Sequence, residues 1–160
     1  MEVQRQEASL SPWYGALAGV VAGLLMAMIG MIATATMGMG ALAMPDMIGG
    51  LILGPGVSMS GGALAALTGL MLHMLLSGLF GVIYTMTISR WIVRAPVLTG
   101  LLYGLALWGV NFYVIGSILP NASGLVQHDP VFLAVLTHLA YGAVLGLSGL
   151  GARALGAVLG

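Results

Sequence analysis

The chain has 160 residues, of which 60% are hydrophobic and 5% are charged. Soluble domains carry about 25% charged residues, so this composition cannot cover a water-facing surface and predicts an integral membrane protein. Four basic residues balance four acidic ones and cysteine is absent, which excludes a basic nucleic-acid footprint, disulfides, cysteine-based zinc fingers and iron–sulfur clusters.

The chain begins with a polar tail, residues 1–10, followed by a helix-start signal. Ser11 is a typical N-cap and Pro12 suits the first helical position. We predict a first span from about Trp13 to Met37, because its apolar run exceeds the roughly 7–15 residues of a signal-peptide core. On this span Gly15, Gly19 and Gly23 form a small-residue stripe that is typical of close helix contacts.

The longest connection, residues 38–61, contains a short apolar segment. Pro45 and Asp46 favour a helix start there, and the helix would run to Leu53. It is too short to cross a bilayer, so we expect it at the membrane surface or over the mouth of the bundle.

Three further spans follow, at about residues 62–89, 96–119 and 130–149. The last begins after Asp129-Pro130, another cap-plus-proline start. The predicted fold is an all-α, four-helix transmembrane bundle that forms one integral membrane domain, residues 1–160.

Charge predicts the orientation of this bundle. Under a four-span count, the basic residues fall on one side and the acidic loop residues on the other: Arg5, Arg90, Arg94 and Arg153 against Asp46 and Asp129. Basic residues near span ends favour the cytoplasmic side. We therefore expect both termini in the cytoplasm and the protein in the plasma (inner) membrane of a bacterium.

The second and fourth spans share a pattern. His73-x3-Ser77-x3-Gly81 matches His138-x3-Gly142-x3-Gly146, and this spacing puts each set on one helix face. The first and third spans share a weaker pair, Tyr14-Gly15 and Tyr103-Gly104. These matches indicate two helical hairpins of common design.

The predicted orientation places the polar groups of the spans in one layer. At about 1.5 Å rise per residue, His73 and His138 differ in depth by only about 3 Å. Asn111 falls in the same layer, and Thr34 lies near it. Because ionisable groups inside a membrane indicate a functional site and face the bundle, we treat His73 and His138 as candidate site residues.

Several interpretations of this layer stay open. The histidines can specify packing through hydrogen bonds to a carbonyl or to Asn111. They can also ligate a b-type haem from both faces, with the second and fourth spans as diagonal neighbours and the small residues of their patterns leaving room. A proton relay is another reading, and a two-histidine metal site lacks carboxylate or thiolate partners, so we predict no metal ion.

Every methionine except Met1 lies between Met26 and Met86. Methionine is adaptable packing material in helices and at partner surfaces, which is the interpretation we prefer. Thioethers also select Cu(I), which leaves a copper site as the alternative.

Three groups of residues carry a family resemblance: Leu72-His73, Gly78-x2-Gly81-x2-Tyr84 and Arg90; Gly100-x2-Tyr103-Gly104-x3-Trp108; and His138-Leu139-x-Tyr141-Gly142-x3-Gly146. Over most of residues 65–150 the chain resembles a family of small bacterial four-span integral membrane proteins of unknown function. The resemblance implies a topology and no activity.

The sequence contains no nucleophile elbow, P-loop, Rossmann glycine pattern or carboxylate pair, so we do not expect an enzyme. The first hypothesis is a non-catalytic accessory or scaffold subunit of a larger membrane complex, respiratory or photosynthetic, with partner subunits in the bilayer. The alternatives are a haem b electron-transfer protein that uses His73 and His138, and a small transporter or channel with a His/Asn polar layer.

Overall fold

The computed structural model describes residues 11–54, 56–57, 62–88, 95–119, 121–122 and 130–159, the last nine by their backbone alone, and all regular structure in these ranges is helical. Four helical segments are long and apolar enough to cross a membrane. They are α1 (Pro12–Thr36), α4 (Ala63–Ile88), α5 (Pro96–Gly109) continued by η1 (Val110–Ile115) and α6 (Gly116–Ile118), and α8 (Val131–Leu159). The short α2 (Ala43–Leu53) lies between the first two.

The predicted all-helical fold with four apolar spans is therefore confirmed. The predicted span ends agree with the helices to about one residue, except that α8 continues to Leu159 instead of ending near residue 149. Most charges that predicted the orientation lie outside the described residues: Arg5, Arg90, Arg94 and Asp129, together with the side chain of Arg153.

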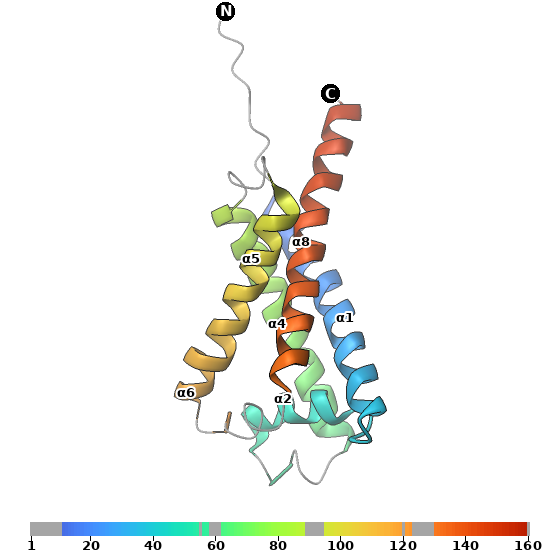
Figure 1. Ribbon diagram of the computed structural model, residues 1–160, viewed down its shortest axis with the longest axis vertical. Helices are drawn as coiled ribbons and strands as arrows, with labels where there is room; N and C mark the ends of the chain where they lie inside the picture. Colours follow the sequence, from blue (N-terminus) through green and yellow to red (C-terminus); the bar gives the residue numbers. More distant parts are fainter. Residues whose placement is uncertain are drawn as a thin grey trace, which may run out of the picture.

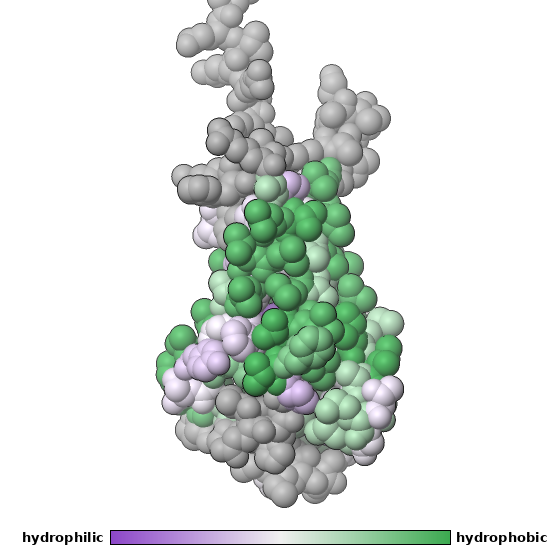
Figure 2. All heavy atoms as spheres, viewed as in Figure 1, coloured by the Kyte–Doolittle hydropathy of each residue, from purple (hydrophilic) through white to green (hydrophobic). Residues whose placement is uncertain are grey.

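The long helices alternate in direction along the bundle (Figure 1). The start of α1 and the end of α8 lie toward one end, and α2 lies across the other. The closest helix pairs are α1 with α4, α5 with α8, α2 with α4, and α1 with α8. Most of the visible face is hydrophobic, and most of the hydrophilic residues on it lie in the half that contains α2 (Figure 2).

Local chemistry accounts for the helix ends. The Ser11 hydroxyl accepts a hydrogen bond from the Trp13 backbone N–H at 3.3 Å, and Pro12 occupies the first turn, as predicted. The short α2 ends at Gly54, whose φ of 91° is a conformation that side chains rarely allow.

Glycines bring the α1 and α4 backbones into direct contact. A Cβ built on Gly19 would lie 3.0 Å from the Cα of Gly81, and one on Gly81 would lie 2.7 Å from the Cα of Gly19. Gly15 and Gly23 flank this point against Thr85 and Ser77. Small residues let helices approach closely where lipid supplies no hydrophobic driving force between them.

The α5–α8 contact repeats this arrangement. A Cβ on Gly100 would lie 3.0 Å from the Cα of Gly146, and one on Gly104 would lie 3.2 Å from the Cα of Gly142. Gly100 therefore meets Gly142 and Gly146 as Gly19 meets Ser77 and Gly81.

The shared pattern of the second and fourth spans thus corresponds to shared packing, but the predicted match of Gly15 with Gly104 was wrong. By their contacts, Gly19 corresponds to Gly100 and Gly23 to Gly104. The reason is that backbone contact with the partner helix sets the register, and the Tyr-Gly dipeptide does not.

Tyrosines join helices through backbone carbonyls. The Tyr14 hydroxyl donates to Ser148 O, which links α1 to α8. The Tyr103 hydroxyl donates to Phe80 O at 2.7 Å, and the Tyr141 hydroxyl donates to Ser77 O at 2.6 Å. The last two bonds connect α5 and α8 to α4, so the two glycine-packed pairs are held together by side chains.

The packing predicts that Gly19→Ala destabilises the protein by about 1–3 kcal/mol, because the new methyl group meets the α4 backbone. The free energy of unfolding measured in mixed detergent micelles checks this. Gly109→Ala is the matched control, since a Cβ there meets nothing within 4 Å, and it should be neutral or slightly stabilising. Equal stability of the two variants would contradict the close contact.

Candidate functional site

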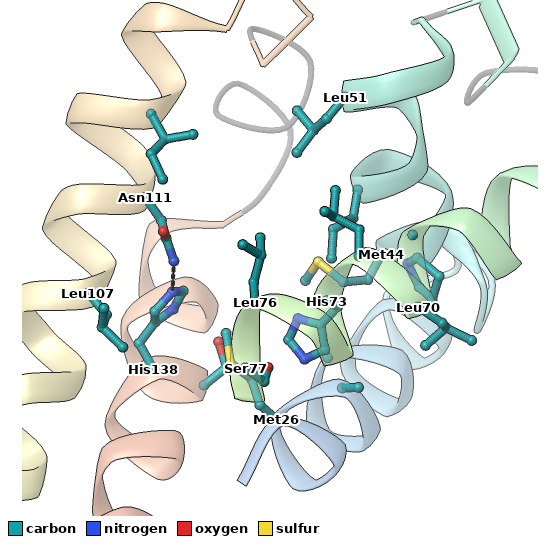
Figure 3. Close-up of a pocket in the computed structure, with 18 of the residues that line it drawn as sticks. Met26, Met44, Leu51, Leu70, His73, Leu76, Ser77, Leu107, Asn111 and His138 are labelled. Carbon is teal, nitrogen blue, oxygen red and sulfur yellow. Dashed lines mark hydrogen bonds between the residues drawn. The ribbon is translucent and has the colours of Figure 1, made fainter. Parts of the chain in front are cut away.

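A cavity of about 410 Å³ lies between α1, α2, α4, the third span and α8. Its volume is in the range of small-molecule pockets, roughly 300–1,000 Å³. Apolar residues form most of its wall, with methionine, leucine and isoleucine the main side chains. The polar residues that line it are His73, Ser77, Asn111, Thr137, His138 and Tyr141. Figure 3 shows Asn111 and His138 on one side of Leu76, and His73 on the other.

His138 is held in one tautomer. Its Nδ1 lies 2.8 Å from Ala134 O one turn earlier in α8, and a carbonyl can only accept, so Nδ1 carries the proton. Its Nε2 then accepts a hydrogen bond from Asn111 Nδ2 at 3.1 Å. The Phe112 ring stands edge-on to the imidazole, with centroids 6.2 Å apart. The histidine is 6% exposed, so this network lies inside the bundle.

His73 makes the equivalent connection on the other side. Its Nε2 lies 3.0 Å from Gly23 O of α1 and donates to it, which leaves Nδ1 as an acceptor. A Cβ on Gly23 would lie 2.5 Å from the Cβ of Ser77 and 3.7 Å from this nitrogen, so the Ser77 side chain, and not the imidazole, requires glycine at this position. The bond adds a polar link to the α1–α4 contact.

Ser77 is a polar lining residue whose hydroxyl is available for a hydrogen bond. It is 4% exposed, and among the described residues its hydroxyl has no hydrogen-bond partner. Its backbone carbonyl is the acceptor for Tyr141. The Ser77 oxygen is not among the fully buried atoms without a partner, so it keeps some accessible surface and can hydrogen-bond to a ligand at the cavity wall.

The structure thus brings His73, Ser77, Asn111 and His138 together around one cavity. Thr34, predicted for the same layer, is outside the lining and donates to Met31 O at 3.2 Å. The small residues predicted for packing lie at the two helix contacts: Gly15, Gly19, Gly23, Ser77 and Gly81 between α1 and α4, and Gly142 and Gly146 between α5 and α8.

The π-helix η1 is a feature that the sequence did not predict. The third span was expected as an uninterrupted α-helix, but it becomes a π-helix at Val110 and contains Asn111 in this wider turn. Rare π-turns occur frequently at functional sites. Gly109 and Gly116 flank the π-helix, but glycines are common throughout this chain and do not by themselves predict a π-turn. The lower part of the third span diverges from α4 and α8 beyond this point (Figure 1).

The short α2 closes one end of the cavity. Met44, Pro45 and Leu51 contribute to the lining, and Asn121 Nδ2 donates to Leu51 O at 3.3 Å, which ties α2 to the end of the third span. Asp46 is on this helix, with Oδ1 buried and without a hydrogen-bond partner. Burial raises the pKa of the Asp46 carboxyl above its ordinary value.

Two kinds of metal group can be compared with these residues. In the ranges that the structure describes, no group of three or more histidine or acidic side chains could hold an ion. Met26, Met31 and Met44 line the cavity together with His73, so thioethers are present there, and a copper site stays a prediction.

The donor set does not fit a haem held from both faces. The Nδ1 proton of His138 is bound to a carbonyl, as is usual for a metal-ligating histidine, but its Nε2 accepts from Asn111. His73 donates its Nε2 proton to Gly23 O. His138 would have to give up the bond from Asn111 before its Nε2 could reach an iron, and His73 would have only its Nδ1 to offer.

Comparison of the chain with protein-family models, curated proteins and solved structures gave no match. The resemblance to small bacterial four-span membrane proteins stays a prediction.

The Tyr141 bond across the cavity floor can be measured. Tyr141→Phe should lower the free energy of unfolding by about 0.5–1.5 kcal/mol, because Ser77 O loses its donor. Tyr113→Phe is the control, since Tyr113 is 66% exposed and its hydroxyl makes no hydrogen bond within the described residues. A Tyr141→Phe protein as stable as the control would show that the bond contributes nothing to the bundle.

Proposed function

We propose that the protein spans the plasma membrane of a bacterium with both termini in the cytoplasm and α2 at the outer surface. Arg5, Arg90, Arg94 and Arg153 support this orientation, because basic residues near span ends favour the cytoplasm. The position of α2 across the bundle end away from the end of α8 supports a surface helix. Asp46 on α2 belongs to the side that lacks arginine.

Single cysteines test the orientation, since the chain has none of its own. Met39→Cys, at an exposed residue after α1, should react with a membrane-impermeant maleimide in intact spheroplasts. Gln6→Cys should react only after lysis. The reverse labelling pattern would invert the proposed topology.

Within the membrane, we infer that the protein acts as a non-catalytic accessory subunit of a larger complex. The observation that carries this proposal is the exposure of the third span. Over its apolar stretch 11% of the residues are buried, against 28% in the first span, 28% in the second and 44% in the fourth. Leu98, Leu102 and Leu105 share one exposed side of α5 and offer a helix face to a partner.

A surface variant tests the subunit role. Leu102→Trp should reduce recovery of partner subunits at least severalfold when the protein is purified from its native membranes in mild detergent, because the larger ring disturbs helix packing. Leu24→Trp on the exposed side of α1 is the control and should keep normal recovery. A monodisperse monomer from native membranes, or equal loss in both variants, would rule out a partner on α5.

The haem hypothesis stays a prediction, and the bond that Asn111 donates to His138 Nε2 counts against it. An oxidised and reduced absorption spectrum of the purified protein decides it. A Soret band that disappears in His138→Ala would establish a haem ligand there, and a spectrum without the band would exclude haem. The transporter or channel hypothesis stays a prediction.

A further inference from the structure

We propose that the cavity binds a neutral lipid whose head is a ring with two opposed oxygen atoms, that is, a membrane quinone or quinol. This proposal does not depend on the subunit role, because it concerns the interior of the bundle and the subunit role concerns the outer face of α5.

The lining selects a neutral ligand. Apart from the two histidines, no ionisable basic or acidic side chain lines the cavity among the described residues. A carboxylate or phosphate head would therefore be buried without a counter-charge, which is costly in a membrane interior. Carbonyl and hydroxyl oxygens need only hydrogen-bonding partners.

The spare hydrogen-bonding groups lie on two walls. On α4, the Ser77 hydroxyl and the His73 Nδ1 acceptor have no hydrogen-bond partner within the described ranges. On the facing side, Asn111 uses one N–H for His138, which leaves its second N–H and its carbonyl oxygen. Each wall thus offers both a donor and an acceptor, so carbonyl and hydroxyl forms of a ligand can both bind.

Opposed polar walls favour a ligand with an oxygen at each end of a rigid body. Figure 3 shows Asn111 and His73 on opposite sides of Leu76, with aliphatic side chains around them. An alcohol or an acyl chain would satisfy one wall and leave the other without a partner. A para-quinone ring satisfies both, and Phe80 and Phe112 provide aromatic contacts beside it.

Trp108 gives the experiment a built-in reporter. Its ring centroid lies 6.3 Å from that of Phe112, which lines the cavity. In the full-length Trp13→Phe/Trp91→Phe protein, Trp108 is the remaining tryptophan, since the chain has three. Quinones quench indole fluorescence, so binding can be followed by titration of a decyl-substituted benzoquinone into protein in quinone-free nanodiscs.

The expected result is saturable quenching by the quinone. Decylbenzene, which has the tail but no oxygens, should displace the quinone with an affinity at least tenfold weaker than that of the quinone itself. Ser77→Ala and Asn111→Leu should each weaken quinone binding about three- to tenfold, the equivalent of one hydrogen bond. Ser117→Ala should change nothing, because Ser117 is outside the lining and donates to Val114 O.

Three results would overturn the proposal. Quenching that rises linearly with quinone would show simple partition into the bilayer. Equal competition by decylbenzene would show a groove for any apolar chain. Unchanged affinity in Ser77→Ala would remove the polar recognition. This variant stays informative if Asn111→Leu does not fold, because the Tyr141 bond uses the Ser77 backbone carbonyl and not the hydroxyl that is removed.

Discussion

Direct contact between helix backbones is the constraint on which this bundle depends. In a bilayer, apolar side chains gain nothing by leaving lipid to contact one another, because the lipid tails are equally apolar. Helices therefore associate through close packing and hydrogen bonds. Gly19 against Gly81 and Gly100 against Gly146 provide that packing at two matching contacts. A single methyl group at either point would have to displace backbone, which is why these positions tolerate only glycine without rearrangement.

The cavity follows from this pairing. Each glycine contact builds one tight helix pair, and the pairs are joined by the α1–α8 contact and by the hydroxyls of Tyr103 and Tyr141. Tyrosines keep the joined helices further apart than glycines do. Space is left toward α2, and the part of the third span from the π-turn onward lines it through Asn111, Phe112 and Ile115.

The histidines serve structure and site together. Each histidine donates one ring N–H to a backbone carbonyl, His73 to Gly23 O and His138 to Ala134 O. This fixes which ring nitrogen remains an acceptor. The fixed tautomers leave Nδ1 of His73 and the Asn111 amide as polar groups at an apolar wall. In a medium without water, such groups bind strongly to whatever supplies the missing hydrogen-bond partner.

The sequence by itself determined the four apolar spans, their ends to about one residue except at the end of α8, the grouping of His73, Asn111 and His138, and the small residues at the contacts. These depend on composition, capping and helical periodicity. Tertiary structure alone decided the register of α1 on α4 and of α5 on α8, the π-turn, the exclusion of Thr34 from the site, and the cavity. These depend on which backbone atoms touch across helices, and a one-dimensional pattern does not contain that information.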